Sequence, residues 1–157
     1  MTVADAIAPA AALAALACVV AAAISDIRRF EIANGLSIAI ALLVLPYGVT
    51  TPGFSWLSHG GVALAVFAAG VGLFAAGWMG GGDVKLLAAA ALWAGVDGLP
   101  GLLLGMSISG GLLAAIAVIG RRLVRVDHPY PALRPGGPLP YAVAILGGVV
   151  VLAVGRC

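Results

Sequence analysis

Long apolar runs separated by short polar segments dominate the pattern of this chain. A helix that crosses about 30 Å of hydrocarbon needs roughly 20 apolar residues. The pattern therefore predicts an all-α, polytopic membrane protein with about six transmembrane helices in a single domain, residues 1–157. The fourth segment is short, so five helices are the alternative. The expected segments are Ile7–Ser25, Ala33–Thr50, His59–Trp78, Val84–Ala94, Pro100–Gly120 and Leu139–Gly155.

The first apolar run lacks the flanks of a cleaved signal peptide. Such a peptide starts with basic residues and has an apolar core of about 7–15 residues. Here the residues ahead of the run include Asp5 and no base, and Arg28 and Arg29 follow the run. We therefore expect a membrane helix that stays in the protein.

Composition supports a surface that faces lipid. Apolar residues make up 63% of the chain and charged residues 9%, whereas a soluble domain carries about 25% charged residues. A net charge of +2 is too small to indicate a nucleic-acid partner. The cysteines, Cys18 and Cys157, and the histidines, His59 and His128, are isolated, which argues against a disulfide framework or a metal site. We expect no cofactor and no metal.

The basic residues predict the orientation in the membrane, because Lys and Arg concentrate in cytoplasmic loops. The second and fourth expected loops, residues 51–58 and 95–99, contain no basic residue. With six spans, the loops that do contain them lie in the cytoplasm and the N-terminus lies outside it. Seven of the eight basic residues fall in or beside the first, third and fifth loops: Arg28, Arg29, Lys85, Arg121, Arg122, Arg125 and Arg134.

Two aspartates lie at the predicted cytoplasmic boundary of the membrane. Asp26 closes the first segment and Asp83 opens the fourth. Ionisable groups at membrane depth are costly and are candidates for function. Two carboxyl groups at one depth suggest an aspartic protease pair, in which the ionised member activates water and the protonated member polarises the peptide carbonyl. The structural alternative is that Asp83 caps its helix and Asp26 pairs with Arg28 or Arg29.

The residues before Asp83 are three glycines, Gly80-Gly81-Gly82. Glycines allow backbone conformations that are closed to other residues, and they leave room for an extended substrate. The spacing differs from that of a phosphate-binding P-loop, which ends in Lys-Ser or Lys-Thr. The glycines are therefore consistent with an accessible site beside Asp83.

Three motifs resemble those of type IV prepilin peptidases, within the wider class of GxGD intramembrane aspartic proteases, and they occur in the order that this family has. Residues 80–85, Gly-Gly-Gly-Asp-Val-Lys, are similar to the GxGDxK signature. Asp26 followed by Ile-Ala-Asn at 32–34 resembles an Asp ahead of Ile-Pro-Asn. Residues 138–145, Pro-Leu-Pro-Tyr-Ala-Val-Ala-Ile, resemble a Pro-Tyr-Gly-x-Ala-Ile stretch.

The resemblance implies a membrane aspartic endopeptidase of the bacterial inner membrane. Asp26 and Asp83 match the two catalytic aspartates. The implied substrates are prepilins or pseudopilins, whose short basic leader is cut after a glycine at the cytoplasmic face. Membrane lipid and the pilus assembly machinery are the other expected partners. The residues expected to shape the site are Gly80, Gly82, Lys85, Asn34, Pro140 and Tyr141.

The departures from the family pattern narrow this expectation. Ala33 replaces the usual Pro, and Ala142 stands where Gly is common, so both departures concern loop geometry. The chain has no Cys-x-x-Cys pair and no room for the zinc-binding cytoplasmic insert of the longer members. It resembles the compact branch that serves Flp-type, tight-adherence pili, and methyltransferase activity is not expected.

The competing interpretation is a small multi-pass transporter or a non-catalytic membrane subunit of pilus assembly. Such a protein also has several spans and helices broken at glycine. A transporter more naturally places its acids near the middle of the bilayer. Asp26 and Asp83 lying close together favour the peptidase, and a wide separation favours the alternative.

Overall fold

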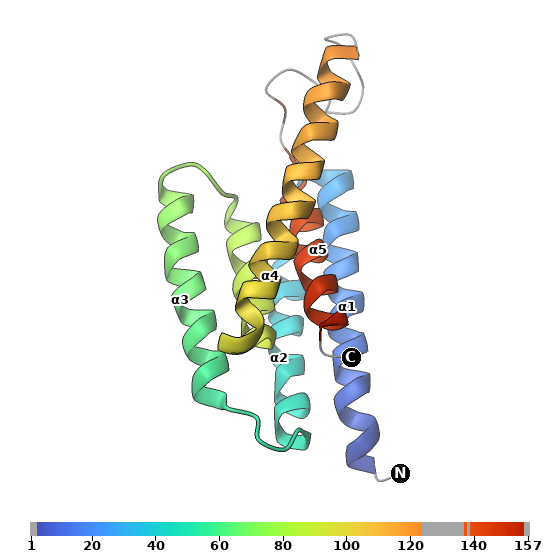
Figure 1. Ribbon diagram of the computed structural model, residues 1–157, viewed down its shortest axis with the longest axis vertical. Coiled ribbons are helices and arrows are strands. Elements are labelled where there is room, and N and C mark those ends of the chain that lie inside the picture. Colours follow the sequence, from blue (N-terminus) through green and yellow to red (C-terminus); the bar gives the residue numbers. More distant parts are fainter. Residues whose placement is uncertain (1–2, 124–136, 138, 156–157) are drawn as a thin grey trace.

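Five α-helices make up the computed structural model, which describes residues 3–123, 137 and 139–155 (Figure 1). No strand occurs within these residues, which confirms the all-α prediction. The expected loop at 124–136 lies outside the described residues. The helices are α1 (Val3–Arg29), α2 (Asn34–Thr50), α3 (Trp56–Ala75), α4 (Gly81–Leu123) and α5 (Tyr141–Val154).

The helices have the length and surface of a membrane bundle. Three segments are long and apolar enough to cross a bilayer, namely Ala6–Arg29, Trp56–Ala75 and Gly81–Arg121, while α2 and α5 are shorter apolar helices. Large apolar side chains such as Leu57 and Val49 are exposed on the outside. An outer surface of this kind is stable against lipid rather than water, so the prediction of a membrane protein is confirmed.

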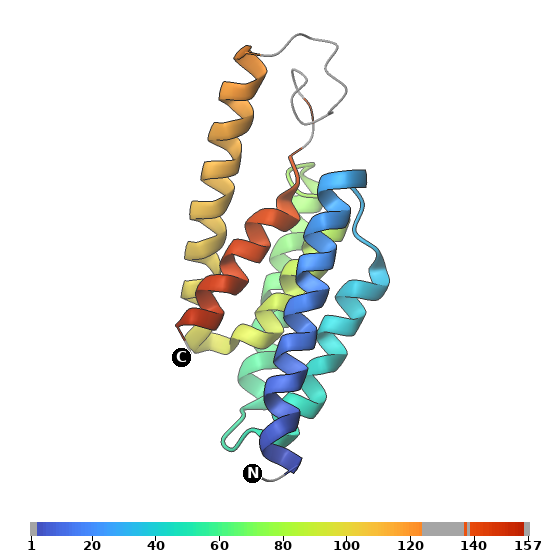
Figure 2. The same cartoon turned by 90° about the vertical axis from the view of Figure 1, so that its right-hand side faces the viewer.

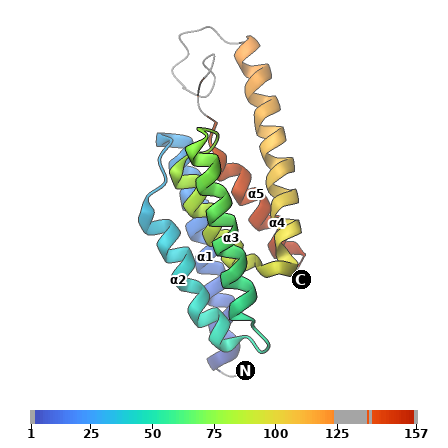
Figure 3. The same cartoon turned by 90° about the vertical axis from the view of Figure 1, so that its left-hand side faces the viewer.

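The helix count is five and not six, because the expected segments Val84–Ala94 and Pro100–Gly120 belong to one element, α4. The helical run is interrupted by the backbone of Gly95 alone, with φ 64° and ψ −171°. Glycine adopts a positive φ without the steric cost that a side chain brings. We call residues 81–94 the first arm and residues 96–123 the second arm. The two arms diverge from a bend at the lower end of α4 (Figures 2 and 3).

Two side chains from α3 support the bend in α4. Leu92 and Val96 are four residues apart and stand on either side of Gly95. The ring Nδ1 of His59 lies 2.8 Å from the Leu92 carbonyl oxygen, and the Val96 N–H donates to the Ser58 hydroxyl oxygen at 3.3 Å. His59, which is isolated in sequence, thus has a structural partner across the bundle. A backbone group inside a membrane bundle requires such a partner, because lipid supplies none.

The core is built around α4 and α1. The first helix packs against α2 and α5, and α4 packs against α2, α3 and α5. Glycines bring α4 and α5 together, since a Cβ on Gly105 would lie 2.8 Å from the Gly148 Cα. Small residues allow this close backbone approach between membrane helices. The largest side chains that are fully buried are Val19, Ile40, Leu86, Leu102 and Ile145.

The arrangement brings three helix ends to one end of the bundle. The C-terminal end of α1 and the N-terminal ends of α4 and α5 lie toward the upper part of the bundle in Figure 1. The start of α1 and the end of α5 lie toward the opposite end. These three upper helix ends contain the motifs that the sequence singled out.

Candidate active site

Asp26 and Asp83 meet at this end of the bundle. Both side chains are buried, with 6% and 9% of their surface exposed. They line the same two cavities, of about 340 and 510 Å³. Their carboxyl groups are near enough to interact electrostatically. Buried carboxyl groups that share a cavity are uncommon outside functional sites.

Asp26 is held by the first turn of α5. It lies within the last turn of α1, which extends to Arg29 and so beyond the apolar run that ends at Ser25. Its Oδ2 accepts a hydrogen bond of 2.9 Å from the buried N–H of Ala142. The first N–H groups of a helix have no partner within the helix, and the N-cap residue Pro140 makes no side-chain cap. Asp26 therefore caps α5 from another helix.

Asp83 uses one oxygen to cap α4 and leaves the other without a partner. The Gly80 N–H bonds to the Asp83 carboxylate, as an acid three residues after a helix N-cap commonly does. Asp83 Oδ1 is buried and has no hydrogen-bond partner among the described residues. The capping interpretation of Asp83 is thus correct for one oxygen. An unsatisfied buried oxygen calls for a functional explanation.

The glycines before Asp83 create space rather than an unusual backbone conformation. A Cβ on Gly80 would lie 2.7 Å from Asp83 Oδ2, and one on Gly82 would lie 3.2 Å from the Ile32 Cβ. Neither glycine has a positive φ; in this loop the positive φ occurs at Gly77. Gly80 and Gly82 therefore do not use the positive φ that glycine allows, and the close distances show that neither position has room for a side chain.

Lys85 and Asn34 form a contact beside the aspartates. Lys85 Nζ donates to Asn34 Oδ1 at 2.9 Å and so links the start of α4 to the start of α2. Asn34 lines the smaller of the two cavities with Asp26 and Asp83. Lys85 lines neither of these cavities, so its contact with the site runs through Asn34.

The start of α5 supplies one wall of the larger cavity. Tyr141 lines this cavity, whereas Pro140 is buried beside it and acts as the N-cap of α5. Arg121 also lines it and donates to the Gly137 carbonyl oxygen at 2.5 Å. From the sequence, Arg121 is expected only to help orient the chain in the membrane. Arg125 and Arg134 lie outside the described residues.

Phe30 is a site residue that the sequence did not indicate. It lines both cavities of the aspartates, and its N–H donates to the Asp26 carbonyl oxygen at 2.9 Å. Its φ is 53°, the one positive φ among described residues other than glycine. This left-handed conformation is strained for a bulky side chain. Because Phe is not a residue that favours it, no local pattern predicts the turn.

The chemistry that this site can support follows from its two carboxyl groups. Within the part of the chain that the structure describes, no three His, Cys, Asp or Glu side chains come together as metal ligands do. Two carboxyl groups beside open cavities can instead divide one proton between them and act on water.

The comparison with protein families agrees with this geometry. The family model described as the type IV leader peptidase family matches residues 13–115. The match includes Asp26, Asp83 and the glycines before Asp83, while Pro140 and Tyr141 lie beyond it. No curated protein and no solved structure matches the chain. Because the family match covers more than half of the 157 residues and three helices can cross a bilayer, the chain is a membrane protease that belongs to the type IV leader peptidase family.

Proposed function

We propose that this protein is an aspartic endopeptidase that removes the leader of prepilins or pseudopilins, with Asp26 and Asp83 as its catalytic pair. The observation that supports this most directly is the burial of both carboxyl groups beside the same two cavities. The pair comes from two helices whose motifs are 57 positions apart in the chain. α2 and α5 each pack against both α1 and α4, and this packing brings the two helix ends together.

The pair performs hydrolysis by dividing one proton between two carboxyl groups. The ionised carboxylate removes a proton from a water molecule, and the water oxygen attacks the carbonyl carbon of the scissile peptide bond. The protonated carboxyl group donates a hydrogen bond to the carbonyl oxygen. When the C–N bond breaks, a proton from the pair passes to the leaving amine. The two groups titrate as one unit, so the proton belongs to the pair rather than to a named member.

The orientation proposed for the site is cytoplasmic. Arg28 and Arg29, in the last turn of α1, are exposed at the end of the bundle that holds the aspartates. Basic residues concentrate on the cytoplasmic side of a membrane protein, which supports the proposal that the start of α1 lies outside the cytoplasm and that the protein belongs to the bacterial inner membrane. The proposed substrate is a precursor with a short basic leader, cut after a glycine before pilus assembly. The compact chain is proposed to serve Flp-type pili and to lack methyltransferase activity.

The position of the acids gives less support to a transporter. Transporters with alternating access bind their substrates and coupling ions near the middle of the bilayer. Asp26 and Asp83 lie instead at helix ends, in the last turn of α1 and the first turn of α4. A non-catalytic assembly subunit does not require two buried carboxyl groups beside a cavity.

The test is cleavage of an Flp-type pilin precursor by the purified protein in lipid. Wild type is expected to cut after the leader glycine. Asp26→Asn and Asp83→Asn keep the size of the side chain and remove the shared proton, so each should lower the rate by roughly 10²–10⁴-fold. The matched control is Asp97→Asn, because Asp97 is exposed and lines neither cavity of the catalytic pair.

Each variant must keep the wild-type helical content and melting temperature for this comparison to count. Loss of cleavage in both site variants with normal cleavage by Asp97→Asn supports the aspartic pair. Normal cleavage by either site variant contradicts it. If wild type cuts no leader among several Flp-type precursors, the assembly-subunit function replaces the peptidase.

A further inference from the structure

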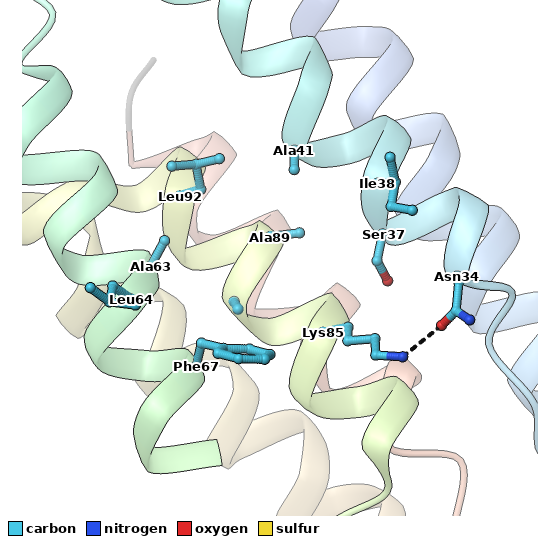
Figure 4. A pocket seen from close by; sticks show the side chains of 11 residues that line it. Asn34, Ser37, Ile38, Ala41, Ala63, Leu64, Phe67, Lys85, Ala89 and Leu92 are labelled. Carbon is cyan, nitrogen blue, oxygen red and sulfur yellow. Dashed lines mark hydrogen bonds between the residues drawn. The ribbon is translucent and has the colours of Figure 1, made fainter. Parts of the chain in front are cut away.

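A third cavity, of about 610 Å³, lies between α2, α3 and the first arm of α4 (Figure 4). We call it the groove. Ile38 of α2 and Phe67 of α3 form parts of its two walls, and Ala88 and Ala89 of α4 lie between them. Most of its lining is apolar, and its small alanines let another chain approach the α4 backbone closely.

The groove begins beside the proposed catalytic pair. Asn34 lines both the groove and the smaller cavity of Asp26 and Asp83. Lys85, two residues after Asp83, lies at the same end of the groove and donates to Asn34 (Figure 4). From this polar end the groove follows the first arm of α4 to Leu92. A peptide that passes the aspartates therefore has a continuous path past Asn34 into an apolar slot.

Ser37 places a hydrogen-bonding group inside this apolar slot. Its side chain is 6% exposed, and its Oγ has no hydrogen-bond partner among the residues that the structure describes. In Figure 4 the oxygen points toward the space between α2 and α4. A buried hydroxyl without a partner is unfavourable, because it has lost its hydrogen bonds to water. Such a group calls for an explanation, and a ligand that completes its hydrogen bond supplies one.

We propose that the substrate continues after the scissile bond as an apolar helix and that the groove, whose lining is mostly apolar, binds this helix. The inference rests on the proposed peptidase function and names the part of the substrate that the enzyme holds. A helix that begins just after an extended cleavage site has free N–H groups in its first turn. Ser37 Oγ lies near the polar end of the groove and can accept from one of them. The apolar side chains of the helix then contact Ile38, Phe67 and Ala89.

A lipid acyl chain fits the groove less well than a peptide. An acyl chain supplies apolar surface but has no hydrogen-bond donor for Ser37 at that depth. It also gives no reason for the groove to begin at Asn34, which the catalytic cavity shares. The peptide accounts for both the continuity and the unsatisfied hydroxyl.

The first experiment compares two substrates in variants whose groove is filled. Ala41→Leu and Ala63→Leu add bulk to opposite walls of the groove, and Ala115→Leu adds it to an exposed position on the second arm of α4. The substrates are a full precursor and a short peptide that ends soon after the cleavage site. The groove variants should lower kcat/KM for the full precursor roughly 10-fold or more and leave cleavage of the short peptide unchanged. Ala115→Leu should match wild type on both substrates.

Two outcomes overturn the proposal. If both groove variants cleave the full precursor with the kcat/KM of the wild-type protein, the substrate helix lies elsewhere. An equal loss on the full precursor and on the short peptide means that the substitutions disturb the catalytic pair rather than a binding site for the helix.

A cross-linking experiment tests the groove without depending on cleavage. Leu64→Cys places a thiol on the groove wall, and Leu112→Cys places one on the second arm of α4, at leucines that are 69% and 61% exposed. Both are made in a background with Cys18→Ala, Cys157→Ala and Asp83→Asn. A precursor with one cysteine in its apolar segment should form a disulfide with Leu64→Cys and not with Leu112→Cys.

This second experiment separates the two proposals. A specific cross-link at position 64 supports the groove even if wild type cuts no precursor, in which case the peptidase function alone fails. Equal cross-linking at the two positions, or none at position 64, overturns the groove as a binding site. If co-purified phospholipid occupies the groove and prevents the cross-link at position 64, the groove is a lipid site and the proposal is also overturned.

Discussion

The side-chain carboxylate of Asp26 accepts a hydrogen bond of 2.9 Å from the backbone N–H of Ala142, which lies 116 residues later in the chain. Both residues are buried, at 6% and 0% exposure. The bond joins the last turn of α1 to the first turn of α5. A proposed catalytic residue thus also stabilises the packing of two helices, and its two roles can be separated by substitution.

Asp26→Asn is expected to lower the rate of cleavage and keep the stability of the fold, whereas Asp26→Ala should lower both. The Asn side-chain oxygen can still accept from the Ala142 N–H, but Ala leaves that N–H without a partner. Loss of a hydrogen bond to a charged group is worth about 1.5–3 kcal/mol. Thermal unfolding in detergent should show a melting temperature near that of wild type for Asn and a clearly lower one for Ala. Equal melting temperatures for the two variants would show that the hydrogen bond between Asp26 and Ala142 contributes little to the stability of the fold.

The backbone strain at Phe30 should appear as a difference in melting temperature between two substitutions at this position. Phe30→Ala and Phe30→Gly both remove the ring from the two cavities, so both should slow cleavage. Only Gly relieves the positive φ of 53°, because a side chain in the left-handed region costs roughly 1–2 kcal/mol. Phe30→Gly should therefore melt at a higher temperature than Phe30→Ala. The reverse order would mean that this conformation stores no strain.

Gly95→Ala should destabilise the protein although Gly95 lies far along α4 from the aspartates. A Cβ at this position would lie 2.9 Å from His59 Nε2, and the φ of 64° disfavours any side chain. The His59 ring cannot easily move, since it stacks on Phe54 with 4.0 Å between ring centroids and contacts the Leu92 carbonyl oxygen. We expect a loss of about 1–3 kcal/mol, read as a lower melting temperature.

The control for this prediction is Gly111→Ala on the second arm of α4. A Cβ there would meet no other atom within 4 Å, so its melting temperature should not fall. A fall of the same size in both variants would trace the effect to glycine content in general rather than to the bend.

Ser37→Ala is expected to separate stability from activity. Removing a buried hydroxyl without a partner costs no hydrogen bond within the protein, so the melting temperature should stay the same or rise. If Ser37 bonds to the substrate helix, KM for the full precursor should rise several-fold while kcat is retained. Ser37→Thr keeps the hydroxyl and serves as the comparison. A fall in melting temperature for Ser37→Ala would indicate that the hydroxyl has a partner within the protein.

The pattern of apolar residues was sufficient to predict the all-α membrane class and the rough position of each helix. It was also sufficient to place Asp26 and Asp83 at the same end of the bundle, because the depth of a residue follows from its distance along a membrane helix. The helix count was wrong because a hydrophobic pattern cannot distinguish a bend at one residue from a loop. At Gly95 the chain remains helical on both sides of a single unusual residue.

The sequence by itself determined the candidate residues of the site, Asp26 and Asp83, and the end of the bundle at which they lie. Lateral relationships among the helices were decided only by the tertiary structure: Asp26 bonds to Ala142, Lys85 bonds to Asn34, and His59 supports the Leu92 carbonyl. The physical reason is that depth in a membrane is a local property of one helix. Neighbours across the bundle depend on how all the helices pack, and so do the strain at Phe30 and the groove beside Ser37.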